Sequence, residues 1–155
     1  MEGTKGMSLM MALGQQVNAT AITELLLSSD PKFDLIVIGG GAAGYMAAIT
    51  AAEEGASSVL LLEATEKPLE KVRISGGGRC NVTHACWNPS FLVENYPRGR
   101  LPLLGPFSRF ATGDAVGWFH DHGLDLIEEP DGRMFPEANT SLAVISCLKD
   151  AAKAA

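Results

Sequence analysis

The stretch DLIVIGGGAAGYMAAITAAEEGASSVLLLE, residues 34–63, decides the fold. It begins with a run of leucine, isoleucine and valine at 35–38, which is followed at once by glycines. An alanine-rich segment at 45–54 predicts a helix, and Gly55 is placed to end it. A second apolar run then ends in Glu63. This order predicts a strand, a tight turn, a helix and a second strand, with both strands parallel and covered on both faces.

The glycines of this unit have the spacing G-x-G-x-x-G, at Gly39, Gly41 and Gly44. In a dinucleotide-binding turn the first glycine permits the tight turn, the second lets a pyrophosphate approach the main chain, and the third lets the helix pack closely on the strand. The phosphates then lie at the N-terminus of the helix, where the dipole favours negative charge. Glu63 ends the second predicted strand, 59–62, where its carboxylate can accept hydrogen bonds from ribose hydroxyls and would repel a 2′-phosphate.

A glycine motif of this kind is weak evidence for a ligand when it stands alone. Here a strand precedes it, a helix follows it, and an acid ends the next strand, which is the context that the motif requires. The alternative is an ordinary βαβ unit with a glycine-rich turn and no ligand. The motif by itself does not decide between FAD and NAD.

A second glycine-rich stretch, ISGGGRCNVTH at 74–84, follows soon after Glu63. Three consecutive glycines are costly in backbone entropy and contribute no side chain to a core. In a βα-type fold this stretch comes near the carboxyl edge of the sheet, where a dinucleotide lies. We therefore expect the N–H groups of Gly76–Gly78 to lie along a second part of the ligand, with polar contacts from Arg79 and Asn81. The alternative is a flexible turn without a ligand.

Four segments together, VIGGGAAG, the acid in LLLE, ISGGGRCNVT and DGRMFP, resemble the HI0933-like flavoproteins, also called the YhiN/BaiN group. The resemblance runs from about Asp34 to Ala155. It implies an α/β fold with a Rossmann-like FAD/NAD(P)-binding domain of the glutathione-reductase type. It also implies an FAD-dependent oxidoreductase that is linked to NAD(P)H and acts on a small molecule of unknown identity.

The resemblance assigns the pyrophosphate of FAD to the first glycine turn, the adenosine ribose to Glu63, and the part towards the flavin to the second glycine stretch. The residues expected to bind FAD are Gly39, Gly41, Ala42, Ala43, Gly44, Glu63, Lys71, Gly76, Gly77, Gly78, Arg79 and Asn81. Many members of the family read Gly-Arg-Lys where this chain reads Leu69-Glu70-Lys71. An acid therefore replaces the arginine at position 70, which removes a basic phosphate contact.

No other group of residues points to chemistry of its own. Cys80, His84 and Cys86 match no strong zinc spacing and lack a fourth ligand, so we expect no metal site. We expect Cys80 to be a packed, inert thiol. His120 and His122 are expected to lie at the solvated end of a short helix. No residue is a convincing general base or nucleophile, and in flavoenzymes the cofactor itself carries the hydride chemistry.

The C-terminal half predicts three further elements and a connection. Asp114 is expected to cap the short helix, and Gly123 to end it. The stretch LDLIEEPDGRMFPE predicts a hairpin that turns at 130–132. A final helix begins near 141 and reaches the end of the chain, and the stretch 97–106 is expected to be a Pro/Gly-rich connection. The apolar face predicted for the final helix consists of Leu142, Ile145, Leu148 and Ala152.

The composition indicates one ordinary globular domain. The 155 residues are 46% hydrophobic and 19% charged, with a formal net charge of −6. The negative charge argues against a nucleic-acid partner, and no apolar run is long enough to span a membrane. Three cysteines form no disulfide framework, so we expect a cytoplasmic setting, with an organellar one as the alternative. The oligomeric state stays open.

Residues 1–32 are expected to form a flexible extension with one weak helical pattern at 17–25, and residues 33–155 to form the FAD-binding domain. Lys5 is the only basic residue among the first thirty, which supports neither a secretory signal nor an arginine-rich transit peptide. Only two parallel strands are predicted, and the last helix has no cap. We therefore expect the N-terminal part of a longer flavoprotein, inactive by itself; the alternatives are a non-catalytic dinucleotide-binding module and a truncated, inactive fragment.

Overall fold

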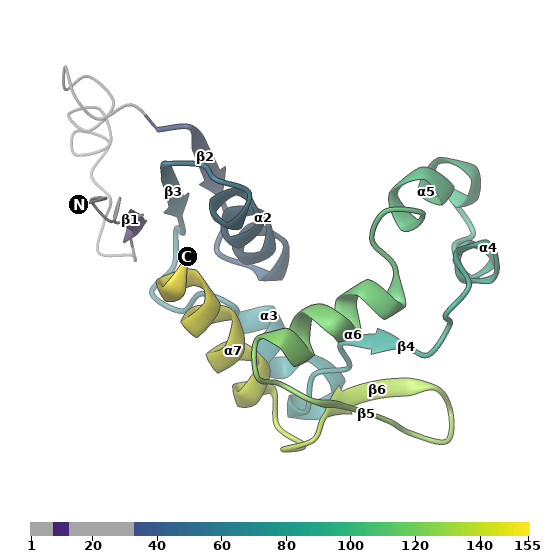
Figure 1. The fold of residues 1–155 in the computed structure, drawn as a ribbon. Helices are drawn as coiled ribbons and strands as arrows, with labels where there is room; N and C mark the ends of the chain where they lie inside the picture. Colours follow the sequence, from purple (N-terminus) through teal and green to yellow (C-terminus); the bar gives the residue numbers. More distant parts are fainter. Residues whose placement is uncertain (1–7, 13–32) are drawn as a thin grey trace. The chain divides into compact units, whose positions relative to one another are not determined.

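The computed structural model describes residues 8–12 and 33–155. The chain divides into two compact units (Figure 1). Unit 1 takes the chain up to Val72 together with Leu148–Ala155, and unit 2 is Arg73–Cys147. The helix predicted at 17–25 lies outside the described residues. Within the described part, no helix is both long enough and apolar enough to cross a membrane.

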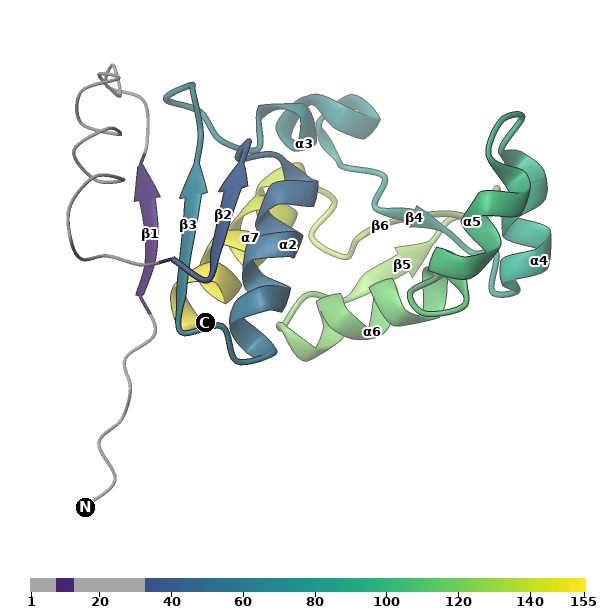
Figure 2. The ribbon, with the colours of Figure 1, turned by 90° about the horizontal axis from the view of Figure 1, so that it is seen from above.

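Unit 1 contains a three-stranded parallel sheet with the strand order β1-β3-β2. The strands are β1 (Ser8–Ala12), β2 (Leu35–Ile38) and β3 (Ser58–Leu62). All three arrows point the same way, so their carboxyl ends share one edge (Figure 2). Strand β1 was not expected, because its short apolar run, LMMA after Ser8, has no periodicity that separates strand from helix, and its place depends on pairing with the distant β3.

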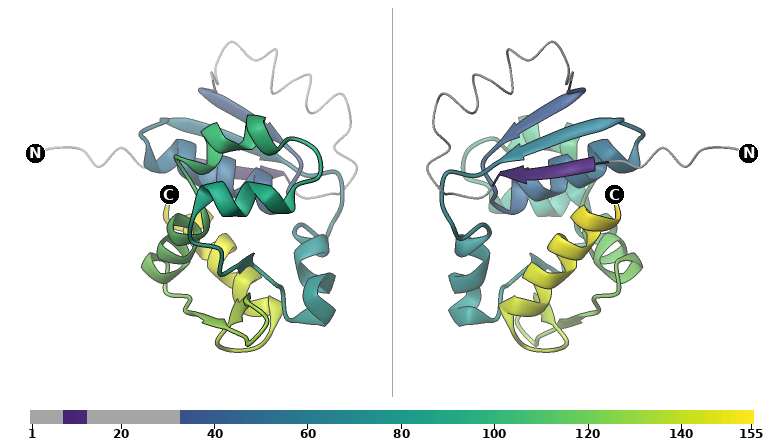
Figure 3. Two further views of the ribbon diagram at one scale, coloured as in Figure 1. Left: turned by 90° about the vertical axis from the view of Figure 1, so that its right-hand side faces the viewer. Right: turned by 90° about the vertical axis from the view of Figure 1, so that its left-hand side faces the viewer.

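Helix α2 (Ala42–Glu53) connects β2 to β3 and packs along the sheet (Figure 3). It begins three residues before the predicted start at Tyr45, directly after the glycine turn. Gly55 ends it as predicted: at a φ of +99° its N–H donates to the carbonyl of Ala52, and the next N–H donates to the carbonyl of Ala51. This pair of bonds is the Schellman arrangement that favours glycine.

The expectation that both strands are covered on both faces is right for β3 and wrong for β2. In β3, Val59, Leu60 and Leu61 are each 1% exposed. In β2, the side chains of Ile36 and Ile38 are 39% and 86% exposed. Strand β3 lies in the centre of the sheet, whereas β2 lies at its edge. At this edge the alternate side chains Ile36 and Ile38 are left exposed, although Leu60, which pairs with Ile36 on the same face, is buried.

Unit 2 contains a three-stranded antiparallel sheet with the order β4-β6-β5. The predicted hairpin is confirmed by β5 (Leu126–Glu128) and β6 (Arg133–Pro136), drawn in yellow-green in Figure 1. Gly132 has a φ of +81° in the turn, and its N–H donates to the carbonyl of Glu129. Strand β4 (Thr83–His84) pairs with β6 and was not expected, because two residues are too few to show an alternating pattern.

Several short helices in unit 2 lie where the sequence analysis predicted no helix. They are α3 (Glu70–Ile74), which begins in unit 1, η1 (Ser75–Gly78), α4 (Pro89–Leu92), η2 (Val93–Asn95) and α5 (Arg100–Phe107). The expectation of a connection at 97–106 is therefore wrong in part, because α5 occupies most of it. Pro102 lies in the first turn of α5, where a missing N–H breaks no helical bond, and Pro106 lies in the last turn.

Helix α6 (Thr112–Asp121) is the predicted short helix. Its cap differs from the expectation: Asp114 is the third helical residue, and its carboxylate accepts a hydrogen bond from the N–H of Ala111 at 2.8 Å. Gly123 ends the helix as predicted, with a φ of +76°, and its N–H donates to the carbonyl of His120.

Helix α7 (Ser141–Ala154) confirms the predicted final helix, but its buried face differs from the predicted one. Leu142 is 61% exposed, and the expectation that it packs in a core is wrong. The buried residues of the helix are Ser141, Val144, Cys147, Leu148, Ala151 and Ala152. Their spacing of three and four residues forms one continuous stripe along the helix. Leu142, the first residue of the predicted face, lies outside this stripe.

The closest packing in unit 1 is between Gly44 of α2 and the turn after β2. A Cβ on Gly44 would lie 1.9 Å from the carbonyl oxygen of Gly39. We predict that Gly44→Ala destabilises the chain by about 3 kcal/mol, because a main-chain carbonyl cannot move aside cheaply. Gly41→Ala is the matched control, since a Cβ there meets nothing within 4 Å, and we expect a change within about 1 kcal/mol. Urea unfolding measures both; equal losses for the two variants would contradict this account.

Candidate functional site

The candidate site of unit 1 is the turn between β2 and α2. Gly39 has a φ of +110°, and its N–H donates to the carbonyl of Leu62 at 2.7 Å, which ties the turn to the end of β3. Gly41 precedes the helix, and a Cβ there would meet no atom within 4 Å. Gly44 admits no side chain at all. The three motif glycines therefore have three different environments, and the main chain at Gly41 is open to a ligand.

The N-terminus of α2 has the electrostatic character of an anion site. The first N–H groups of a helix have no acceptor within the helix, and they carry the positive end of its dipole. No acidic residue lies in the first turn of α2. Ala42 and Ala43 are exposed there, and their short side chains leave the N–H groups accessible. A Cβ at Gly41 would stand in this open space, so the residues present fit a pyrophosphate.

Glu63 lies beside this turn at the carboxyl end of β3. One carboxylate oxygen accepts a hydrogen bond from the N–H of Gly40 at 2.6 Å, and the other accepts two from the N–H and hydroxyl of Thr65, each at 2.8 Å. The hydroxyl of Thr65, followed by the N–H groups of Thr65 and Gly40, holds the pKa of Glu63 below its usual range. The carboxylate is therefore ionised at neutral pH and held next to the glycine turn.

Gly40 is a part of this site that the sequence reading missed. A Cβ at this position would lie 2.9 Å from the Cβ of Glu63, so the acid leaves no room for a side chain. The carbonyl of Gly40 also accepts a hydrogen bond from the N–H of Leu69 at 2.8 Å. Leu69 is buried and has a φ of +63°, a left-handed conformation that favours glycine. The unbroken run of three glycines was the available signal for Gly40.

A separate candidate site is the glycine loop of unit 2, which we define as residues 75–81. All three of its glycines have a left-handed backbone, with φ values of +55°, +67° and +85°. A Cβ at Gly76 would lie 2.7 Å from the N atom of Asn81, whereas Cβ atoms at Gly77 and Gly78 would meet nothing within 4 Å. The packing of the loop itself thus requires the first glycine, and the main chain at the other two is open.

The polar side chains of the glycine loop contact the hairpin. Arg79 forms an ion pair with Glu129, with 2.6 Å between Nη1 and Oε1, and its guanidinium lies 3.9 Å from the ring centre of Phe135. The Oδ1 atom of Asn81 accepts a hydrogen bond from the N–H of Met134 at 3.3 Å. The sequence reading missed these hairpin partners, although the motif DGRMFP pointed to the right segment.

The remaining expected residues are placed as follows. Lys71 is exposed on α3, and its contact with a cofactor stays a prediction. Cys80 is buried, as expected of a packed thiol, and has a φ of +62°. In residues 8–12 and 33–155 no three potential ligands among His, Cys, Asp and Glu gather to hold a metal ion.

The two histidines of α6 differ in their surroundings. His120 is exposed, and its Nδ1 lies 2.6 Å from Oδ1 of Asp125, whose hydrogen bond raises the pKa of the imidazole. His122 is half-buried, stacks on Trp118 with 3.9 Å between ring centres, and shares a hydrogen bond between its Nδ1 and the carbonyl of that residue. The expectation of a solvated helix end therefore holds for His120 and is wrong for His122.

Residues 33–155 match the sequence profile described as the HI0933-like protein Rossmann domain. The chain belongs to this family. It is 35% identical over 104 residues to the ribosomal RNA dihydrouridine synthase of Escherichia coli strain K12, covering 67% of this chain and 25% of that protein. It is 31% identical over 114 residues to the 3-dehydro-bile acid delta(4,6)-reductase of Clostridium scindens, covering 73% and 27%. The chain spans about a quarter of the length of these curated relatives.

The hydrogen bonds at Glu63 predict a pH dependence of stability. The folded pKa is below the unfolded value, so the ionised carboxylate stabilises the folded chain at neutral pH. This contribution is lost as the pH falls from about 4.3 through the folded pKa. We predict that Glu63→Gln lowers the free energy of unfolding at pH 7 and makes this free energy fall less steeply as the pH is lowered. Urea unfolding between pH 3 and 7 measures both effects.

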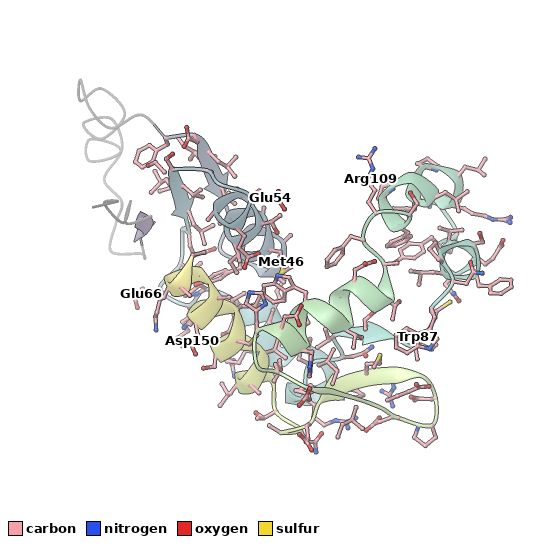
Figure 4. The ribbon with its side chains drawn as sticks, viewed as in Figure 1. Met46, Glu54, Glu66, Trp87, Arg109 and Asp150 are labelled. Carbon is pink, nitrogen blue, oxygen red and sulfur yellow. The ribbon has the colours of Figure 1, made fainter. Side chains whose placement is uncertain are left out.

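Glu66 provides the control for this measurement. It is exposed in the same segment (Figure 4), and the described residues contain no hydrogen bond or ion pair to its side chain. Glu66→Gln removes the same charge, and the decrease of its unfolding free energy at low pH should stay close to that of the wild type. If the pH dependence of the unfolding free energy became equally weak in both variants, the effect would be due to net charge and not to the Glu63 hydrogen bonds.

Proposed function

We propose that this chain binds FAD and anchors it as part of an oxidoreductase that NAD(P)H reduces. The observation that carries the proposal is the open main chain at Gly41 beside the ionised carboxylate of Glu63. Family membership adds to it, since one of the two relatives is named a reductase and the name of the other describes a dihydro product. When bound, the flavin supplies the hydride chemistry.

The residues of unit 1 have two tasks in this proposal. Gly41, Ala42 and Ala43 present N–H groups to the pyrophosphate at the positive end of the helix dipole. Glu63 accepts hydrogen bonds from the adenosine ribose through the lone pairs that Gly40 and Thr65 leave free, since an ionised carboxylate has about four acceptor sites and three are in use. A 2′-phosphate next to this carboxylate is repelled, which favours FAD over NADP here.

The glycine loop of unit 2 is proposed to bind the cofactor towards the flavin, through the open main chain at Gly77 and Gly78. Lys71 is proposed as a basic phosphate contact. The binding domain is proposed to cover residues 33–155, and the preceding extension, residues 1–32, contributes β1 to its sheet. The proposal also includes a cytoplasmic setting and a mechanism without a metal.

The substrate class follows from what the two relatives' names share. One name describes a dihydrouridine product, and the other describes reduction of a Δ4,6 bile acid that carries a 3-oxo group. In uracil and in a 3-oxo-Δ4 steroid, the reducible C=C bond is conjugated to a carbonyl. We therefore propose an alkene conjugated to a carbonyl as the substrate. The net charge of −6 favours a small molecule over ribosomal RNA.

Titration of the purified chain with FAD, followed by flavin fluorescence and calorimetry, tests the cofactor. We predict that the wild type binds FAD and that Gly41→Val abolishes binding, with a change in unfolding free energy of only about 1 kcal/mol. Glu63→Gln should weaken binding about tenfold, because a charge-assisted hydrogen bond is lost. Glu66→Gln should bind like the wild type. FAD binding that survives Gly41→Val would overturn the assignment of the turn, and a wild type that binds no FAD would overturn the proposed function.

Because the chain is expected to be inactive by itself, anaerobic mixing of NADH or NADPH with the FAD-loaded oxidoreductase of which it is proposed to be part tests the reaction class. We predict bleaching of the flavin absorption, and reoxidation by an α,β-unsaturated ketone but not by an isolated alkene of the same size. Bound FAD that neither nucleotide reduces would favour a non-catalytic binding module. Reoxidation by both alkenes alike would refute the proposed substrate class.

A further inference from the structure

The hairpin β5–β6 holds the glycine loop of unit 2 at several points. The ring of Phe135 lies against Gly76, where a Cβ would come within 3.1 Å of it. The N–H of Val82 donates to the carbonyl of Met134 at 2.9 Å, and the N–H of Met134 donates to Asn81. The conformation of the loop therefore depends on contacts with a segment that lies about fifty residues later in the chain, as the separation of 53 between Asn81 and Met134 shows.

Arg79 is the one loop side chain in this set whose charge the hairpin neutralises. Its partner Glu129 lies next to the turn, and the side chains of the pair are 32% and 31% exposed, which shields them partly from solvent. The second oxygen of Glu129 lies 3.6 Å from Arg133, a longer contact, and Arg133 is bound more closely by Asp131 at 2.7 Å. The carboxylate of Glu129 is therefore chiefly the partner of Arg79.

The guanidinium of Arg79 has little freedom to reach a ligand in this arrangement. Glu129 accepts its hydrogen bond at 2.6 Å, Asn139 lies 3.4 Å from the same nitrogen, and Phe135 covers one face of the group. A direct contact with a cofactor would require Arg79 to leave a charged partner and an aromatic ring together. Such contacts are lost only at a cost, because both the ion pair and the stacked ring favour the planar guanidinium in this place.

We propose that Glu129 is a positioning residue for the cofactor site. It acts through Arg79: the carboxylate and the ring of Phe135 hold the guanidinium, and Arg79 in turn holds the left-handed main chain of Gly76–Gly78 in the form that faces the flavin. The inference rests on the proposed FAD binding. It changes the role of Arg79, which supports the loop from behind and does not itself bind the cofactor.

The two roles of Arg79 predict opposite effects of Glu129→Gln on the affinity for FAD. If Glu129 positions the loop, the substitution weakens binding, and we expect a loss of about five- to tenfold with little change in the unfolding midpoint. If Arg79 binds the cofactor directly, the substitution frees the guanidinium, and the affinity stays equal or rises. Glu128→Gln is the matched control, because Glu128 is an exposed neighbour on β5 and the described residues contain no side-chain partner for it.

Two further variants sharpen the test. Arg79→Lys keeps the charge but loses the planar group that stacks on Phe135, and it should weaken binding to a similar extent. Because both residues act through one contact, the double variant should be no weaker than either single variant. Glu129→Asp keeps the carboxylate and should recover part of the affinity. Additive losses, or an unchanged or tighter affinity in Glu129→Gln, would overturn the proposal.

Amide hydrogen exchange of residues 76–81 in the ligand-free chain separates this inference from the proposed function. We expect Glu129→Gln to speed exchange in this segment, and Glu128→Gln to leave it unchanged. If the wild type binds no FAD, the proposed function fails, while faster exchange in Glu129→Gln still supports the positioning of the loop. Unchanged exchange in Glu129→Gln would overturn the positioning role whether or not FAD binds.

Discussion

The close approach of helix α2 to the turn after β2 is the constraint on which unit 1 depends. Because Gly44 has no side chain, helix α2 lies directly against the carbonyl of Gly39, and the N-terminus of the helix lies at the glycine turn. This packing determines where the open main chain at Gly41 lies. It also brings Gly40 to the end of β3, where Glu63 binds its N–H. The dipole, the open turn and the carboxylate thus occupy one edge of the sheet as a consequence of one missing methyl group.

Local chemistry made a large part of this predictable from the sequence. The strand 35–38, the helix stop at Gly55 and the hairpin turn at Gly132 depend on residues within a few positions of each other, and they lie where the pattern placed them. The three environments of the motif glycines also follow from their spacing. Elements whose place depends on distant partners were not predictable, as β1 and β4 show: each is a short strand that exists only by pairing with another segment.

The candidate site shows the same division. Glu63 was predictable because it ends a strand at a known distance from the glycines, but its contact with Gly40 was not, since it joins residues on either side of a whole helix. Arg79 and Asn81 were expected to contact a ligand because the glycine stretch was predicted to lie near the carboxyl edge of the sheet, where a dinucleotide binds. Their hairpin partners lie in a segment about fifty residues away in the sequence. No local pattern indicates whether a polar side chain will bind a ligand or another part of the protein.

The candidate sites of the two units are built by different means, and this has a functional consequence. In unit 1 the groups proposed to face the ligand are the main chain at the start of helix α2 and the carboxylate of Glu63, whose positions depend on sheet and helix packing. In unit 2 they belong to a left-handed loop that depends on side chains of a hairpin, and chiefly on an ion pair that is a third exposed. Such a loop responds to the charge and salt around it far more than a packed turn does. In the proposed function, binding of the pyrophosphate therefore depends on the packing of unit 1, whereas the loop proposed to face the flavin is the part that the sequence of the hairpin can adjust.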